Sequence, residues 1–442
     1  MTGDRQSYSA MPDWRRNQLA ITISASMIFL GFTLVTPFLP FYIESIGVEG
    51  EAAIAIWSGL LLSITPLLAA LLGPFWGRLA DRVGMRIMVQ RVLITVTAHW
   101  GLMFFTTEVW QILVLRVLLG LFSGFGTMSV ALITHGCPKE RIGRAIGTLQ
   151  AAQIMSTALG PLIGGVLAQS IGIRSTYLVT CGLCAAALCL VASIYRDVET
   201  GDEADAPVVV AQAGPVTEGV RAVVPPPRSR VAPPPRPFRE ILALPGFRSL
   251  LPLLFFANLV DRAFFLIVPL FLTAMAAGSG TLEATTGVVL SAGALAGAAS
   301  AFLLGRGIRR LPPLPVLFWS LLSGTVLVFA MGMSRTVLSF ALLRVLVGLA
   351  IGGAATLLYT IAGDVIPSHG RAASYGMLSS AAVLGGALGP SMSGLLGAVS
   401  PRAPLFAGGI IYLALTVQVF LLARRQGLLR TAVFPRPLGG GF

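Results

Sequence analysis

The stretch LRVLLGL at residues 115–121 recurs almost unchanged as LRVLVGL at residues 343–349. Each copy carries one arginine inside a long apolar run and a glycine four residues later. Further along, GPLIGG at 160–165 recurs as GPSMSG at 389–394, so the two pairs of motifs are separated by nearly the same length of chain. A chain that repeats itself at about half its length is predicted to fold as two related halves, an organisation common among membrane transporters.

The composition indicates that the chain is a membrane protein. Hydrophobic residues make up 55% of the 442 residues and charged residues only 11%, and the mean hydropathy is +0.84. Soluble domains carry about 25% charged residues. Many apolar runs here reach the roughly 20 residues that cross a bilayer as a helix. We therefore expect an all-α membrane protein.

Apolar runs between charged and turn residues predict twelve transmembrane helices in two six-helix pseudo-repeats. The expected spans are 17–43, 54–76, 88–106, 110–134, 145–169, 175–195, 248–275, 284–304, 314–333, 337–363, 372–399 and 403–423. The expected units are a tail (1–16), an N-terminal half (17–195), a Pro- and Arg-rich linker (196–247), a C-terminal half (248–423) and a second tail (424–442). We expect the linker to be extended or disordered, because its composition cannot bury a core.

The positions of Lys and Arg predict the orientation. Outside the predicted spans, all of these residues except Arg174, Arg335 and Arg402 fall on one side of the twelve-span map. Arg116, Arg262 and Arg344 lie deep within spans, and Arg91 and Arg248 lie at span ends on the Arg-rich side. The positive-inside rule then places both termini and the linker in the cytoplasm. The net charge of +13 follows from this topology, so we expect contact with the lipid bilayer and no nucleic-acid partner.

The connection after the second span reads GRLADRVGMR, residues 77–86. It resembles the signature loop G-x-L-a-D-r-x-G-r-k of the major facilitator superfamily. The matching positions are Gly77, Leu79, Asp81, Arg82, Gly84 and Arg86. Met85 departs from the arginine that is common there, and the second-half counterpart at 305–310 lacks the acid. A carboxylate between guanidiniums forms charge-assisted bonds that can hold and release a moving interface, so we expect a gating loop.

Two further patterns resemble the same family. Arg116 opens the fourth span in R-x-x-x-G, similar to the family's R-x-x-q-G with Leu119 in place of Gln. Gly160, Pro161, Gly164 and Gly165 resemble the G-P-x-x-G-G motif of its drug exporters. The resemblance implies a major facilitator fold and a drug:proton antiporter. Glycines also allow helices to pack closely, and proline bends a helix, so packing is an alternative role.

Asp261 is the one carboxylate deep within a predicted span, and Arg262 follows it directly. A carboxylate buried in low dielectric takes up protons more readily, and ionisable residues inside a membrane are commonly functional. We expect Asp261, Arg116, Arg262 and Arg344 to take part in proton coupling. The alternative is that Asp261 is a structural ion-pair partner.

Other polar and aromatic residues in the spans are candidates for lining a cavity. They are Phe32, Trp57, His99, Gln150, Gln153, Phe255, Asn258, Phe265 and Tyr359. Each has a structural alternative, as a packed ring or as a hydrogen bond between helices. The four cysteines show no metal-binding spacing in a polar context, so we expect no metal site.

The sequence contains no phosphate-cradling glycine loop, nucleotide motif or Ser-His-Asp arrangement. We therefore expect no enzyme activity and no cofactor, and a proton gradient as the energy source. The predicted function is efflux of small amphiphilic or cationic compounds by a monomer in the inner membrane. One alternative is export or uptake of a metabolite such as a sugar, siderophore or amino-acid derivative. A more distant one is a scaffold that recruits a partner through its Pro-rich linker.

Deleting residues 200–236 separates a transporter from a scaffold. A transporter should keep its activity, because the deleted segment contains no predicted span. Substrate flux in vesicles that contain the deletion variant measures the effect. Loss of function with a normal amount of membrane-inserted protein would instead support the scaffold.

Overall fold

The computed structural model describes residues 13–123, 129, 132–133, 137, 141–194, 246–276, 281–307, 312–366 and 371–425. The helices of the first half are α1 (Asp13–Val35), η1 (Thr36–Phe38), α2 (Leu39–Ser45), α3 (Glu51–Val83), α4 (Met85–Met103), α5 (Val109–Phe122), α7 (Ile142–Ile171) and α8 (Ile173–Ile194). Those of the second half are α10 (Phe247–Ala276), α11 (Leu282–Gly307), α12 (Pro313–Met333), α13 (Val337–Ile351), α14 (Ala354–Val365), α15 (Arg371–Gly397) and α16 (Ala403–Arg425). The linker and both tails lie almost entirely outside the described residues.

The helices coincide with the predicted spans. Within the described ranges, nine helical segments are long and apolar enough to cross a bilayer. The shorter α5 and the less apolar α4 and α15 occupy the positions of the remaining three spans. The all-α architecture of twelve membrane helices is therefore confirmed.

Several helices are longer or more broken than the apolar runs predicted. α3 continues to Val83 and α7 already begins at Ile142, because a helix keeps its internal hydrogen bonds beyond the apolar stretch. The first span breaks at η1, where Pro37 precedes Pro40 by one turn, since proline removes a helical donor. The tenth span breaks between α13 and α14 at Gly352, whose position touches the backbone of α11.

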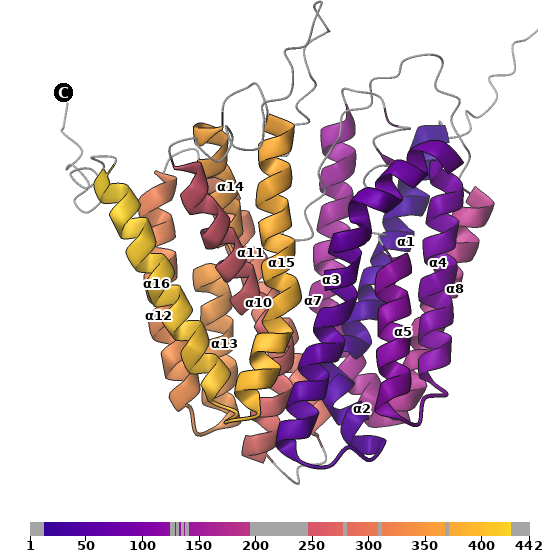
Figure 1. Cartoon of the computed structure of the whole chain (residues 1–442), viewed down its shortest axis with the longest axis horizontal. Coiled ribbons are helices and arrows are strands. Elements are labelled where there is room, and N and C mark those ends of the chain that lie inside the picture. Colours follow the sequence, from indigo (N-terminus) through magenta and orange to yellow (C-terminus); the bar gives the residue numbers. More distant parts are fainter. Residues whose placement is uncertain are drawn as a thin grey trace, which may run out of the picture.

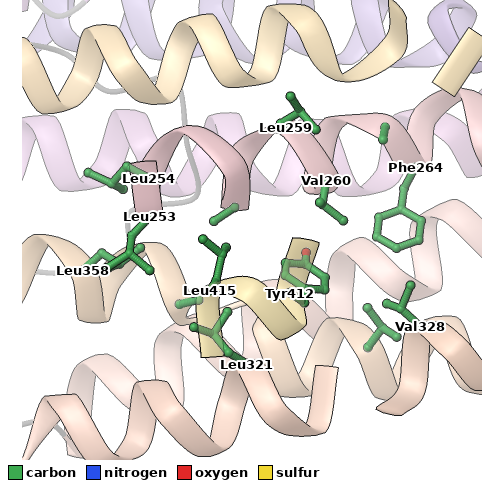
Figure 2. Close-up of a cluster of buried hydrophobic side chains, with 14 of the residues drawn as sticks. Leu253, Leu254, Leu259, Val260, Phe264, Leu321, Val328, Leu358, Tyr412 and Leu415 are labelled. Atoms are coloured by element: carbon green, nitrogen blue, oxygen red, sulfur yellow. The ribbon is translucent and has the colours of Figure 1, made fainter. Parts of the chain in front are cut away.

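Each half has its own hydrophobic core. Trp100, Tyr42 and Tyr177 are the largest buried side chains of the first. In the second, Val260 and Phe264 of α10 pack with Tyr412 of α16 (Figure 2). Figure 1 shows the two groups of helices side by side, with α3 and α15 adjacent at the centre.

The internal repeat extends to the ends of helices. α5 begins at Val109 and α13 at Val337, so the two helix starts are separated by the same length of chain as the two arginines. The residue before each start caps the helix: Glu108 in a capping box with Gln111, and Thr336 by accepting from the Ser339 N–H at 3.2 Å. The two related segments therefore fold alike locally.

The helix bundle has two ends, the linker end and the far end. The linker end is where α8 ends at Ile194 and α10 begins at Phe247. The far end is where α3 begins at Glu51 and α7 ends at Ile171.

Candidate functional site

The two halves meet through glycines near the far end. Gly59 of α3 faces Gly394 of α15, and Gly165 of α7 faces Gly287 of α11. A Cβ on any of these four would lie closer than 3.0 Å to backbone of the other half. Glycine is therefore needed for this approach, and larger residues would separate the halves.

Two hydrogen bonds cross the same contact. The Leu162 N–H donates to Ser291 Oγ at 2.8 Å, and the Ser391 N–H donates to Ser63 Oγ at 2.9 Å. Each N–H follows a proline inside a helix, Pro161 or Pro390. A helical proline displaces neighbouring backbone bonds, and in a membrane such groups need another partner. In both cases that partner is a serine of the opposite half.

The halves separate toward the linker end. Along α3, Gly59 and Ser63 are buried, whereas Gly73 and Gly77 are exposed. No atom lies within 4 Å of a Cβ built on Gly73 or Gly77, and the same holds for Gly147 of α7 and Gly376 of α15. The space between the halves is therefore closed at the far end and open at the linker end.

Arg344 of α13 is buried among the helices of the second half. Its guanidinium carbon lies 4.4 Å from the centroid of the Phe264 ring, and its side chain covers Gly293 of α11. Asp261 of α10 acts electrostatically on both Arg344 and Tyr412. These residues bring a carboxylate, a guanidinium and a phenol from three helices together.

The expected burial of Asp261 is wrong, because its side chain is exposed. α15 packs on α10 at Phe255 and Leu259, and α16 packs at Val260. Asp261 lies on the side that these two helices leave free. Asn258 and Phe265, three residues before and four after it, share this side because of helical periodicity. Asp261 is therefore reachable by water, ions or a substrate.

Arg262 points elsewhere than Asp261, as the 100° between adjacent helical residues predicts. Its side chain packs on Gly386 of α15, and its guanidinium carbon lies 6.0 Å from the centroid of the Phe265 ring.

Arg116 of α5 has aromatic rather than acidic neighbours. Its guanidinium carbon lies 5.7 Å from the centroid of the Trp100 ring, and the Phe32 ring meets the same tryptophan edge-on at 5.2 Å. His99 is buried beside it and its Nδ1 lies 3.2 Å from the Leu115 carbonyl oxygen. Phe32 and His99 therefore belong to one cluster with Arg116.

The remaining cavity candidates have diverse surroundings. Gln150 is buried, whereas Gln153, Trp57 and Phe255 are half-buried. Asn258 donates to the Leu254 carbonyl of its own helix at 2.9 Å, so its amide is already used locally. Tyr359 stacks with Tyr375, the ring centroids 6.4 Å apart. These contacts favour the packing alternative for Asn258 and Tyr359.

The predicted gating loop is a single residue between two helices. Gly84 separates α3 from α4 with φ +96°, a conformation suited to glycine. Arg82 is exposed, whereas Arg86 is half-buried and interacts with another group. The side chain of Asp81 lies outside the described residues. The role of the loop therefore stays a prediction.

Sequence reasoning missed the two serines that join the halves. Ser63 and Ser291 are related by the same offset along the chain as Arg116 and Arg344. That offset was the available signal, but a serine in an apolar run is inconspicuous. Tyr412 and Tyr177 were missed for a different reason, because only packing brings each beside an arginine.

A family profile and individual relatives both match this chain. The sequence profile of the Major Facilitator Superfamily matches residues 21–337 and 280–436. Multidrug resistance protein MdtG of Enterobacter lignolyticus (strain SCF1) is 32% identical over 350 residues, which are 78% of this chain and 77% of that protein. MdtG of Rahnella sp. (strain Y9602) is 40% identical over 183 residues, 41% of this chain and 44% of that protein.

Solved structures share the fold. A bacterial homolog to the human lysosomal transporter Spinster, in an inward-facing and occupied conformation, aligns with a TM-score of 0.73. The alignment covers 94% of this chain and 98% of that chain at 17% identity. At this identity the likeness concerns the arrangement of helices.

Replacing Ser291 with Ala should weaken the far-end contact, because it leaves the Leu162 N–H without its acceptor. The expected cost is about 1–3 kcal/mol of the closed arrangement. In a Pro161→Ala background the N–H regains its own helical carbonyl, so Ser291→Ala should then cost little. Spin labels at Glu49 and Arg402, both exposed near the far end, report the distance between the halves.

The internal repeat offers a second test of the same contact. Ser63→Ala should weaken the contact, and it should cost little in a Pro390→Ala background. The control is Ser323→Ala, which removes an exposed hydroxyl bonded within α12 and should leave the distance between the halves unchanged. An equal effect of Ser291→Ala with and without Pro161 would show that the hydroxyl does not serve the proline-freed donor.

Proposed function

The chain belongs to the Major Facilitator Superfamily, and on that basis we propose that it exports small amphiphilic or cationic compounds in exchange for protons. Family membership implies that the chain is a multi-pass membrane transporter of small molecules. The proposal of proton-coupled export rests on Asp261, an exposed carboxylate within a membrane helix that acts electrostatically on the buried Arg344.

The geometry supports an alternating-access cycle. The halves contact each other at the far end through glycines and serines and separate at the linker end. Opening the opposite way requires these contacts to break and the linker end to close. A ligand shifts such an equilibrium only if it binds the two states unequally.

Charge distribution supports the direction in which the space opens. The linker end carries nearly all Lys and Arg outside the spans, which places it in the cytoplasm under the positive-inside rule. The described arrangement then opens to the cytoplasm of a bacterial-type inner membrane, where an exporter takes up its substrate. The termini lie on the same side in this proposal.

Export is supported by relatives and by a motif. Relatives that align over more than three quarters of their length are named multidrug resistance proteins. Pro161 and the glycines around it, which resemble the exporter motif, form part of the far-end contact. The motif thus stands where the halves must separate to release a substrate.

Coupling is assigned to competition at Asp261. An ionised carboxylate attracts Arg344 and a cationic substrate alike, and Phe265 on the same side offers apolar surface. Protonation removes that charge, so the substrate is released as the proton binds. In this proposal, Arg262 and Arg116 contribute to the exchange of proton and substrate at Asp261 through packing and electrostatics. No resident metal or cofactor is part of the proposal, and a monomer contains both halves of the site.

A second candidate is transport of a metabolite, since the exposed carboxylate of Asp261 could also bind a polar compound. Flux of a chemically varied panel in proteoliposomes, with and without a proton gradient, separates the two. Movement of a polar metabolite without any movement of lipophilic cations would favour this candidate.

Replacing Asp261 with Asn should abolish proton-driven export, because the amide keeps the shape but has no charge to exchange. Uptake of a lipophilic cationic dye into inside-out proteoliposomes with an acidic lumen should fall about tenfold or more. The matched control is Asp364→Asn, which removes an exposed carboxylate from the linker end of α14. Unchanged gradient-driven uptake in the Asp261 variant would remove this residue from the mechanism.

A further inference from the structure

Four polar side chains form a buried cluster in the first half, here called the Arg116 cluster: His99, Trp100, Arg116 and Tyr177. None is more than 3% exposed. The Trp100 ring centroid lies 4.7 Å from that of His99 and 5.9 Å from that of Tyr177, and 5.7 Å from the Arg116 guanidinium carbon. α4, α5 and α8 thus bring four polar groups into one small volume.

The polar atoms of this cluster are largely unsatisfied. His99 Nε2, Trp100 Nε1, the Tyr177 hydroxyl, and Nε and Nη2 of Arg116 have no hydrogen-bond partner within the described part of the chain. Each such group costs about 1–3 kcal/mol when it is buried without a partner. Several at one place indicate a bound group that completes them, because buried polar atoms are nearly always paired.

Hydrogen-bond chemistry restricts what that group can be. Trp100 Nε1 and the Arg116 nitrogens can only donate, and the Tyr177 hydroxyl can also donate. The Leu115 carbonyl can only accept, so His99 Nδ1 carries a hydrogen. In neutral His99 the Nε2 atom is then a hydrogen-bond acceptor with a lone pair. In protonated His99 the same atom is a donor, like the free groups of Trp100, Arg116 and Tyr177. With His99 protonated, every free group of the cluster donates.

Within the part of the chain that the structure describes, no carboxylate acts on Arg116 as Asp261 acts on Arg344. In the second half Arg344 has Asp261 as its electrostatic partner. The offset that relates Pro161 to Pro390 places Phe32 at the equivalent position of the first half, where its ring packs on Trp100. The acidic residues of the first half stand at helix ends or in connections. The first half therefore has an arginine without the carboxylate that the second half supplies.

We propose that the Arg116 cluster binds a monovalent anion, either a small inorganic ion or the carboxylate of a transported compound, together with one proton on His99. Arg116, Trp100 and Tyr177 donate to the anion. Neutral His99 would oppose it with a lone pair, so the anion and the proton bind together. Anion affinity should therefore rise as the pH falls.

Few other titratable groups among the described residues surround His99. Arg116 of α5, Tyr177 and Cys181 of α8, and Tyr42 of α2 are the ones that contact the cluster or its immediate neighbours. Tyr42 is already bonded to Thr106, and Cys181 donates to the Thr97 carbonyl at 3.4 Å. From α1 the cluster receives Phe32, which does not titrate. His99 is therefore the group of the Arg116 cluster whose protonation would accompany the binding of an anion.

Binding is tested on the full-length protein in nanodiscs without any gradient. Chloride and benzoate are titrated separately against gluconate at constant ionic strength, at pH 5.5 and 7.5, and the thermal unfolding midpoint and tryptophan fluorescence are recorded. We expect roughly tenfold or tighter binding at the lower pH, because one proton is taken up with each anion. A response to chloride indicates an inorganic ion, and a response to benzoate alone indicates a substrate carboxylate.

Variants separate binding from folding. Tyr177→Phe removes only a hydroxyl that has no partner, so it should preserve stability but lower anion affinity. His99→Gln should abolish the pH dependence, and Arg116→Gln should abolish binding. Arg335→Gln, which removes an exposed charge at the far end, should leave affinity unchanged.

The absence of any anion response in the wild-type protein at pH 5.5 would overturn the proposal, as would a response that Arg116→Gln and Tyr177→Phe leave intact. Neither result bears on dye export through Asp261, because this assay measures binding without transport.

Discussion

In a bilayer, a helix must satisfy its own backbone hydrogen bonds, and a proline inside a helix removes one of the donors. Pro161 and Pro390 lie deep in α7 and α15, and the N–H after each is bonded by a serine from the other half. Glycines beside these bonds let the backbones approach. The contact that joins the halves is thus built from groups that each half cannot satisfy alone. Water can satisfy the same N–H groups when the halves part, so the contact is reversible.

The two halves share a backbone plan but differ in charge. Each carries an arginine at the equivalent place, Arg116 in α5 and Arg344 in α13. Asp261 accompanies Arg344, while its positional equivalent, Phe32, packs with an aromatic neighbour of Arg116. A guanidinium in low dielectric needs compensation. Asp261 supplies a negative charge for Arg344, whereas Arg116 has aromatic neighbours instead. This asymmetry gives a symmetric scaffold two distinct sites.

Much of the fold could be predicted from the sequence, because apolar length and the repeat are local properties. The spans around Val109 and Val337 were placed within one residue of the observed helix starts. The break at Gly352 was not foreseen, since it results from the approach of α11 rather than from the local sequence. Arg116, Arg344 and Asp261 were identified because charges are rare in apolar runs. Their neighbours Tyr177 and Tyr412 were not, because tyrosines are ordinary in such runs.

The sequence by itself determined that the chain crosses the membrane in two related halves, because hydropathy and the internal repeat can be read along the chain. Only the tertiary structure decided which side of each helix faces the space between the halves. Asp261 was expected to be buried and is exposed, because α15 and α16 cover the other sides of α10. Ser63 and Ser291 became functional candidates only when the opposite half placed a proline-freed N–H beside each. The side that each helix turns toward the other half is set by packing between segments that are distant in the sequence, and no local pattern in the sequence encodes it.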